Sequence, residues 1–516
     1  MPPLLLTGRD LTIDQVIEVA RGRRAVTLAS DAADRMRASR AVIERLVADG
    51  ATVYGVTTGF GDLADVRIDP SRTAELQRNL VRSHAAGVGK PLHDDVVRAM
   101  LVLRANALAV GLSGVRVEVV DLLIGMLNAA VHPVVPSRGS LGASGDLAPL
   151  AHLALVVIGE GEATVDGAGP GDGATALRRA GLAPIELAAK EGLALLNGTQ
   201  LMAGIGALAH HDALRLAISA DVIGAMSLDA MLGTGAAFDE RLIAARPHPG
   251  QVIAARHLRE LLRDSEIWAS HRADTEHRVQ DAYSLRCMPQ VHGAARDALG
   301  ELERVLRVEI NAATDNPLVF PSGDVISGGN FHGEPLALAL DYATMAVAEI
   351  ASISERRTAR LVDAHLNGGL PAFLTEQPGM ESGLMIAHYT AAALVNELQS
   401  LSHPASVDTI STSANQEDHV SMGGTSALQL AAAVDRAEHV LAIEALCAAQ
   451  ALDFREPMKP GAGVAAAHAT IRARLPHRSA DGPPAPEIAT LRTLIHAGDL
   501  LANPATGRAH GPPDDG

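Results

Sequence analysis

Hydrophobic residues recur at helical spacing over four long stretches in the later part of the chain. Residues 200–232, 334–361, 382–401 and 425–454 are rich in Ala and Leu, repeat their apolar positions every three or four residues, and contain no proline beyond the first turn. A helix of about 28 residues spans about 42 Å and is hard to bury singly. The pattern therefore predicts a bundle of nearly parallel and antiparallel helices, shared between subunits.

The first 200 residues instead mix short elements, glycine-rich turns and helices. Residues 94–131 predict two helices joined at 111–114, and residues 166–173 predict a surface loop or hairpin tip. We therefore expect a mainly α protein with a long central helix bundle and a smaller mixed N-terminal portion. Its predicted parts are an N-terminal domain at 1–200, a helical bundle domain at 201–503 and a disordered tail at 504–516.

Composition narrows the possible partners. Hydrophobic residues make up 47% of the chain and aromatic residues only 2%, so Ala, Leu, Val and Ile carry the apolar content and favour helices. The formal net charge of −17 argues against binding to nucleic acid or an anionic membrane, which needs clustered Lys and Arg. A small-molecule partner is the better expectation.

Two cysteines exclude a disulfide framework, and the N-terminal leucine run is too short for the core of a signal peptide. The longest apolar stretch contains His210, His211, Asp212, Arg215 and Asp221, which makes it a poor membrane span. These features predict a cytoplasmic protein.

The tripeptide Ala143-Ser144-Gly145 offers chemistry that no ordinary side chain supplies. The unhindered glycine nitrogen can attack the alanine carbonyl with loss of water, and loss of the serine hydroxyl then leaves a methylidene on an imidazolone ring. This product is an electrophile. The tripeptide taken alone is typical of a turn.

Six further motifs interrupt the Ala-Leu background with polar residues. Five of them have an ordinary structural explanation: a loop tyrosine as a packing anchor, a lone histidine as a structural group, Asn-Gly as a helix cap, a polar helix face as a solvated one, and a glutamate as a helix N-terminal charge. Gln280, Tyr283 and Arg286 are spaced by three, which predicts one helix face. An amide, a phenol and a guanidinium also suit an amino-acid substrate, because Arg binds carboxylates bidentately. The residues singled out in these motifs are Tyr54, His84, Asn197, Gln280, Tyr283, Arg286, Phe331 and Glu417.

In combination and order, the six segments resemble the aromatic amino acid ammonia-lyase family from about residue 11 to residue 454. The resemblance implies a fumarase/aspartase-like helical architecture, a homotetramer with sites drawn from three subunits, and the group 4-methylidene-imidazole-5-one formed from Ala143, Ser144 and Gly145. It implies no metal and no diffusible cofactor, and the sequence has no carboxylate-histidine cluster with the spacing of metal ligands.

The resemblance also assigns roles. Tyr54 matches the family's proposed base, Arg286 would hold the substrate carboxylate, and Asn197 and Tyr283 would support the carboxylate and the ring. His84 and Glu417 would contact the substrate side chain, while Gln280 and Phe331 match positions that line the pocket. Asp146 is assigned to positioning the tripeptide.

The discriminating positions resemble the histidine branch of the family. Ser83-His84 and Gln416-Glu417 match the pairs found there, and a carboxylate suits an imidazole held by its N–H groups. A phenyl ring would leave Glu417 unpaired at a cost of about 1–3 kcal/mol. A tyrosine or phenylalanine ammonia-lyase, a 2,3-aminomutase, and an inactive helical scaffold remain the alternatives.

Overall fold

The computed structural model describes residues 1–51, 53, 58, 69, 72–142, 145–271 and 279–500. By contacts the chain divides into two compact units, each assembled from three segments. The first comprises residues 1–211, 302–341 and 404–429, and the second comprises residues 212–301, 342–403 and 430–516. The predicted tail at 504–516 lies outside the described residues.

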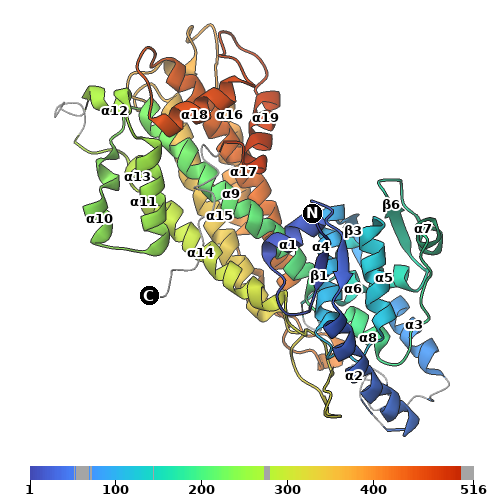
Figure 1. Cartoon of the computed structure of the whole chain (residues 1–516). Helices are drawn as coiled ribbons and strands as arrows, with labels where there is room; N and C mark the ends of the chain where they lie inside the picture. Colours follow the sequence, from blue (N-terminus) through green and yellow to red (C-terminus); the bar gives the residue numbers. More distant parts are fainter. Residues whose placement is uncertain are drawn as a thin grey trace. The chain divides into compact units, whose positions relative to one another are not determined.

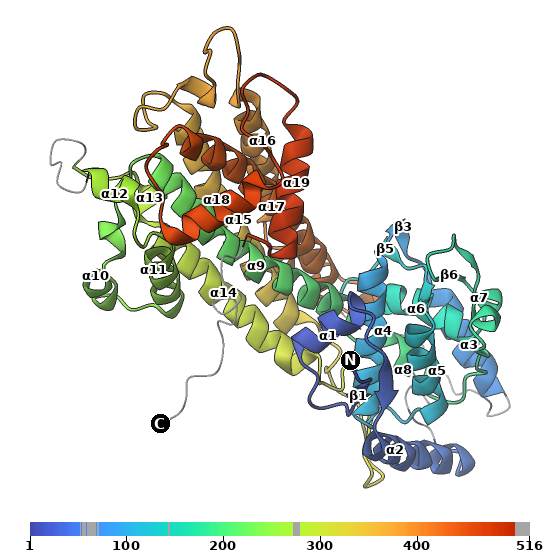
Figure 2. The same ribbon diagram turned by 45° about the horizontal axis from the view of Figure 1, so that its top comes forward.

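The first unit is built from short helices and small sheets. Figure 2 shows α4, α5, α6 and α8 packed together within it. Its elements are β1 (Leu4–Leu6), α1 (Ile13–Ala20), β2 (Val26–Leu28), α2 (Ser30–Ala48), α3 (Thr73–His84), β3 (Val88–Pro91), α4 (Asp94–Ala109), α5 (Val117–Asn128), β4 (Val131–Pro133), β5 (Pro136–Arg138), α6 (Leu147–Val157), β6 (Glu162–Val165), β7 (Gly171–Asp172), α7 (Gly173–Arg179), α8 (Glu191–Leu196), β8 (Leu318–Val319) and β9 (Val325–Ile326).

The strands form four small sheets with the orders β1-β2, β3-β5, β4-β6-β7 and β8-β9. Only β1 and β2 pair in parallel among the described strands, with Leu4 opposite Val26. The hairpin between β6 and β7 confirms the turn predicted at residues 166–173. Helices α4 and α5 likewise confirm the pair predicted over 94–131.

Four long helices cross the boundaries between the two units: α9 (Gln200–Ala230), α14 (Met288–Glu309), α15 (Glu334–Val362) and α17 (Gly423–Asp453). Figure 1 shows them running alongside one another as the main bundle. The contact-based units therefore differ from the division predicted after residue 200, because that division followed sequence texture along the chain. The predicted mainly α bundle is confirmed, and three of the four predicted long helices are α9, α15 and α17.

The remaining elements of the second unit are shorter. The fourth predicted long helix is among them, as α16. These elements are α10 (Glu240–Ala244), α11 (Pro249–Leu261), α12 (Glu266–His271), α13 (Tyr283–Arg286), α16 (Met385–Leu401), α18 (Ala462–Arg472) and α19 (Ala485–Ala497).

Of the described helices, α15 alone has the length and hydropathy of a membrane span. However, 67% of the apolar window is buried inside the protein, as expected for a core helix.

Helix α14 was not predicted, and buried charge explains why. His292 and Arg296 interrupt its apolar pattern, yet both are buried and paired with the carboxylate of Asp221 on α9, His292 Nδ1 at 2.7 Å and Arg296 Nη2 at 2.7 Å. These contacts hold the pKa of Asp221 below its usual range despite its burial. Pro289 also suggests a break in the helix, but it lies in the first turn, where proline is tolerated.

A second buried ion pair joins α15 to α17 within the second unit. The Arg357 guanidinium donates to both carboxylate oxygens of Glu444, at 2.5 and 2.8 Å, and both side chains are fully buried. The hydroxyls of Ser227 and Ser354 also donate to Glu444, each at 2.6 Å. The carboxylate is thus satisfied by four donors, which makes its desolvation tolerable.

Removing one partner of this pair should destabilise the fold. Arg357→Met leaves the Glu444 charge buried without its cation, at an expected cost of about 3–5 kcal/mol in unfolding free energy. The double variant Arg357→Met/Glu444→Gln removes both charges and should recover a large part of that loss. Thermal and urea unfolding of the three proteins measure the difference. A double variant no more stable than the single one would contradict the role given to the buried charge.

Candidate active site

Residues on both sides of Ala143-Ser144 are tightly anchored, although these two residues lie outside the described part of the chain. Gly142 adopts a φ of +68°, and its carbonyl accepts hydrogen bonds from Ser421 Oγ at 2.9 Å and from the backbone N–H of Gly333 at 3.0 Å. The chain ahead of the tripeptide is therefore fixed to the segments that precede α15 and α17.

The third residue of the tripeptide lies against the loop that follows α8. Gly145 has a φ of +76° and forms a parallel bridge with Gly198, and a Cβ at position 145 would lie 2.1 Å from the Gly198 carbonyl oxygen. The next N–H, of Asp146, donates to that same oxygen at 2.6 Å. Only glycine satisfies both the conformation and the close approach.

Asp146 connects this segment to the first turn of α9. Its fully buried carboxylate accepts the backbone N–H groups of Leu201 and Met202 at 2.8 and 3.1 Å and the hydroxyl of Ser140 at 2.6 Å. A carboxylate at a helix N-terminus satisfies free N–H groups and complements the helix dipole. Burial raises the pKa of Asp146 to about 6, although the three hydrogen bonds favour the charged form.

Asn197 is the C-cap of α8 and is buried. Its backbone carbonyl accepts from Arg104 Nη1 at 2.8 Å, and the next residue is Gly198, which contacts Gly145. Asn197 thus directly precedes the residue that contacts the tripeptide segment.

His84 and Glu417 come from segments more than 300 residues apart and interact electrostatically. His84 is half-buried at the end of α3, where its Nδ1 lies 2.9 Å from the carbonyl oxygen of Leu80. A carbonyl only accepts, so Nδ1 carries the proton and Nε2 is an acceptor in the neutral ring. Burial lowers the pKa of His84, and the carbonyl of Leu80 and the charge of Glu417 oppose that shift.

Glu417 is itself half-buried and accepts a hydrogen bond from Thr412 Oγ1 at 3.2 Å. It precedes α17 by several residues, so it is no first-turn charge of that helix. Phe331 is half-buried in the loop ahead of α15, two residues before Gly333, which is bonded to Gly142.

Gln280, Tyr283 and Arg286 belong to the second unit, and they do not share a helix face. Helix α13 contains only four residues, with Ala282 as its N-cap, and Gln280 lies in the bend before it. The predicted common face was wrong because Asp281 bonds the backbone N–H of Thr234 at 2.7 Å and holds that bend outside the helix.

Tyr283 and Arg286 do lie together. The Arg286 guanidinium carbon is 4.7 Å from the Tyr283 ring centroid, and the phenol is 72% exposed. Arg286 Nε is buried and has no hydrogen-bond partner within the described residues. The pair therefore keeps donor capacity for an anion.

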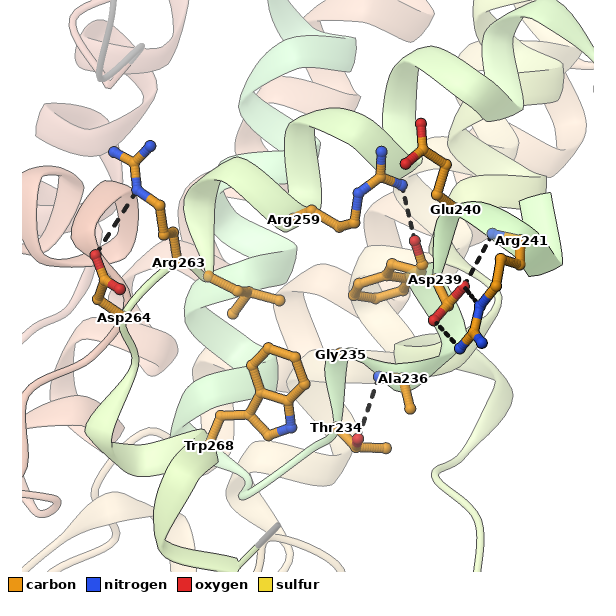
Figure 3. Close-up of a pocket in the computed structure, with 12 residues that line it drawn as sticks. Thr234, Gly235, Ala236, Asp239, Glu240, Arg241, Arg259, Arg263, Asp264 and Trp268 are labelled. Carbon is orange, nitrogen blue, oxygen red and sulfur yellow. Dashed lines mark hydrogen bonds and ion pairs between the residues drawn. The ribbon is translucent and has the colours of Figure 1, made fainter. Parts of the chain in front are cut away.

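A pocket of the second unit lies elsewhere. It has a volume of about 870 Å³ and lies beside Trp268, the single tryptophan of the chain (Figure 3). Its arginines are already engaged, Arg241 with Asp239 at 2.8 Å and Arg259 with the Phe238 carbonyl at 2.8 Å. None of the predicted site residues that the structure describes lines it.

Comparison with known proteins identifies the family. The model of the family described as aromatic amino acid lyase matches residues 11–473. This chain belongs to the aromatic amino acid lyase family.

Among the curated members, the histidine ammonia-lyase of Anaeromyxobacter sp. (strain K) is 55% identical over 97% of this chain and 100% of its own length. Among solved structures, histidine ammonia-lyase from Trypanosoma cruzi has a TM-score of 0.90 at 42% identity, covering 99% of this chain and 96% of its own. Tyrosine aminomutase from Streptomyces globisporus has a TM-score of 0.93 at 36% identity, covering 98% and 99%. The predicted fumarase/aspartase-like architecture is confirmed.

The prosthetic group of this lyase family is 4-methylidene-imidazole-5-one, and Ala143-Ser144-Gly145 is the segment that forms it here. The described flanks fit that group, because a residue with a Cβ at position 145 would collide with Gly198, and the Gly142 carbonyl is anchored by Ser421 on the other side. No cluster of three His, Cys, Asp or Glu residues suited to a metal ion occurs in the described ranges.

Sequence reasoning missed several residues that complete this part of the lyase fold. Ser421, Arg104 and Lys190 all contact the segments around the tripeptide or α8. Arg104 could have been noticed as a charged residue within the apolar helix α4. Lys190 lies in a motif already noted, but nothing in the motif indicates that its side chain is fully buried.

Ring formation predicts a mass deficit. The purified wild-type chain should be lighter than its sequence by two water molecules, whereas Ser144→Ala lacks the hydroxyl that the second dehydration removes. Intact-mass spectrometry should show part of the missing mass restored in Ser144→Ala, together with loss of most activity. A wild-type chain of unmodified mass would refute the cyclisation.

Proposed function

We propose that this chain is an ammonia-lyase that eliminates ammonia from L-histidine to give trans-urocanate. The proposal is carried by the chemistry of His84 and Glu417, two hydrogen-bonding side chains of the unit that holds the tripeptide, where the charge of Glu417 acts on the His84 ring. Two hydrogen-bonding groups can pair with the ring nitrogens of an imidazole, whereas a phenyl ring would leave both unpaired. The names of the Anaeromyxobacter and Trypanosoma relatives support the same substrate.

The proposed contacts of the imidazole follow from the protonation of the two side chains. His84 presents Nε2 as an acceptor, because Nδ1–H is donated to the Leu80 carbonyl. Glu417 offers carboxylate oxygens. A substrate imidazolium has two N–H donors, one for each of these groups, and its positive charge complements the carboxylate.

The amino-acid end of the substrate needs a cation and a base. Arg286 holds the carboxylate with its guanidinium, of which Nε has no hydrogen-bond partner within the described residues, and Tyr283 and Asn197 support this end of the substrate. Gln280 and Phe331 line the pocket. Tyr54, which lies outside the described residues, removes the β-proton.

Ionising a phenol with an ordinary pKa near 10 costs about 4 kcal/mol at neutral pH, so neighbouring cations or donors must assist Tyr54. The methylidene-imidazolone supplies an electrophile for the substrate amino group, which makes that nitrogen a better leaving group. The side chains of the protein hold the substrate against this electrophile and remove its β-proton.

The proposal includes the assembly expected of the lyase family. The protein acts as a cytoplasmic homotetramer in which each site draws on three subunits, with an amino acid as its small-molecule partner and neither nucleic acid nor membrane. Residues 1–200 carry the electrophile and residues 201–503 form the bundle domain in this scheme.

A 2,3-aminomutase is the second candidate, supported by the likeness to tyrosine aminomutase at 36% identity. A mutase returns the amine to the β-carbon, so the two reactions differ in how long the product is retained. The same residues would serve both.

Incubation with single amino acids separates these functions. The purified protein should convert histidine, and not tyrosine or phenylalanine, to the unsaturated acid and ammonia, with products identified by mass spectrometry. Heat-inactivated protein provides the control. Turnover of tyrosine alone would overturn the substrate assignment, and a β-amino acid product would replace the lyase with a mutase.

The pH dependence of substrate binding should report on His84. Since burial holds its pKa below 6.5, His84 is neutral at pH 7 and accepts a proton only as the pH falls further. Protonation removes the Nε2 acceptor and repels an imidazolium, so KM for histidine should rise at low pH in the wild type.

In His84→Gln that additional rise should disappear, while KM at pH 7 increases on the order of 10-fold from loss of one hydrogen bond. The substrate's own imidazole titrates in the same range in both proteins, so the ratio of the two KM values isolates His84. A ratio independent of pH would contradict this role.

A further inference from the structure

Two buried cations hold the two ends of α8, the helix that ends at Asn197. Lys190 is the N-cap residue and adopts a φ of +74°, and its Nζ donates to Asp315 at 2.6 Å. Arg104 bonds the Asn197 carbonyl at the other end. Both cations are fully buried, and Asp315 is the acid that acts on each of them.

Arg104 lies directly behind the peptide that contacts the tripeptide. Its Nη1 donates to the Asn197 carbonyl and to Gln200 Oε1, each at 2.8 Å. A Cβ on Gly198 would be 2.3 Å from this nitrogen and 2.4 Å from Gln200 Oε1, so a side chain there would displace the Arg104–Gln200 pair. The Gly198 carbonyl in turn receives the Asp146 N–H.

This arrangement is costly for stability alone. Arg104 Nε and Nη2 are buried without a hydrogen-bond partner in the part of the chain that the structure describes. Burial lowers the pKa of Arg104 to about 10, even though Asp315 opposes the shift. An unbranched apolar side chain would fill similar space without burying donors. We therefore attribute to the guanidinium a role in positioning the peptide that it bonds.

We propose that Arg104 is a positioning residue for formation of the methylidene-imidazolone, acting through the Asn197–Gly198 peptide that holds Gly145 and Asp146 in place. The Lys190–Asp315 pair fixes the other end of α8 and so supports the same peptide. This inference rests on the prosthetic group of the proposed function and concerns its making, not the turnover of substrate.

The chemistry that must be positioned is a ring closure followed by dehydration. The Gly145 nitrogen bonds to the Ala143 carbonyl carbon, and the first water takes that carbonyl oxygen with the N–H hydrogens of Gly145 and Ser144. The second water takes the Ser144 hydroxyl and its α-hydrogen. Misplacing reacting atoms by about 1 Å slows such a reaction on the order of 100-fold.

Arg98 offers a matched control on the same helix. It is 3% exposed, and its guanidinium bonds the carbonyls of Val19, Ala20 and Leu127, away from α8. Both arginines thus lie on α4, are buried, and donate to main-chain carbonyls. Arg98→Met therefore controls for the loss of a buried arginine of α4 that does not contact α8.

The experiment follows ring formation by intact mass in Arg104→Met, Arg104→Lys, Arg98→Met and the wild type, from shortly after a brief induction through incubation of the purified full-length chain. The two-water deficit should appear 10- to 100-fold more slowly in Arg104→Met. Arg104→Lys should be intermediate, because an ammonium can bond the Asn197 carbonyl without the planar fork. Arg98→Met should mature at the wild-type rate.

The outcomes separate this inference from the proposed function. A wild type without the deficit would overturn the prosthetic group itself. Wild-type maturation in Arg104→Met overturns the positioning role, as does equally slow maturation in Arg98→Met, which would reflect general damage. If Arg104→Met does not fold, Arg104→Lys decides, and maturation at the wild-type rate in that variant overturns the inference.

Discussion

The carboxylate of Asp146 is the contact on which the arrangement around the tripeptide depends. One short side chain caps the first turn of α9, a helix of 31 residues, and directly follows the segment that forms the electrophile. A long helix is a stiff element, so a group bonded to its first N–H groups is held to the scaffold with little freedom. Asp146, which follows the tripeptide, is thus attached directly to the helix scaffold.

Glycines make that attachment possible at close range. Gly145 and Gly198 approach so nearly that a Cβ on Gly145 would overlap the opposite backbone, and Arg104 leaves no room for one on Gly198. Glycine at these positions costs stability, because glycine loses more conformational freedom on folding than any other residue. In return it places two main chains in fixed register without flexible side chains between them.

The sequence allowed the long helices to be predicted but not the way in which they are held together. Uniform Ala-Leu patterns revealed α9, α15, α16 and α17, whereas α14 was missed because His292 and Arg296 look like surface residues. Periodicity assumes that charge faces solvent, and a charge that is buried and paired defeats that assumption.

The candidate site likewise contains features that the sequence could predict and features that it could not. The proximity of His84 and Glu417 has no signature in local spacing, so it followed only from the resemblance to the lyase family. The three-residue spacing of Gln280, Tyr283 and Arg286 gave a wrong helix face, because Asp281 bonds Thr234 and fixes the bend outside α13. Residues 54, 143 and 144 lie outside the described chain, so their roles stay predictions.

The proposed contacts serve two separate purposes, binding of the amino-acid carboxylate and selection of the aromatic ring. Arg286 and Tyr283 can recognise the amino-acid end of any aromatic substrate, since every such substrate carries the same carboxylate. In the proposed function, discrimination comes from His84 and Glu417, because a half-buried carboxylate left without an N–H donor disfavours the wrong ring. A phenyl or phenol ring makes apolar contacts similar to those of an imidazole, but it offers Glu417 no ring N–H donor to offset the desolvation of its charge.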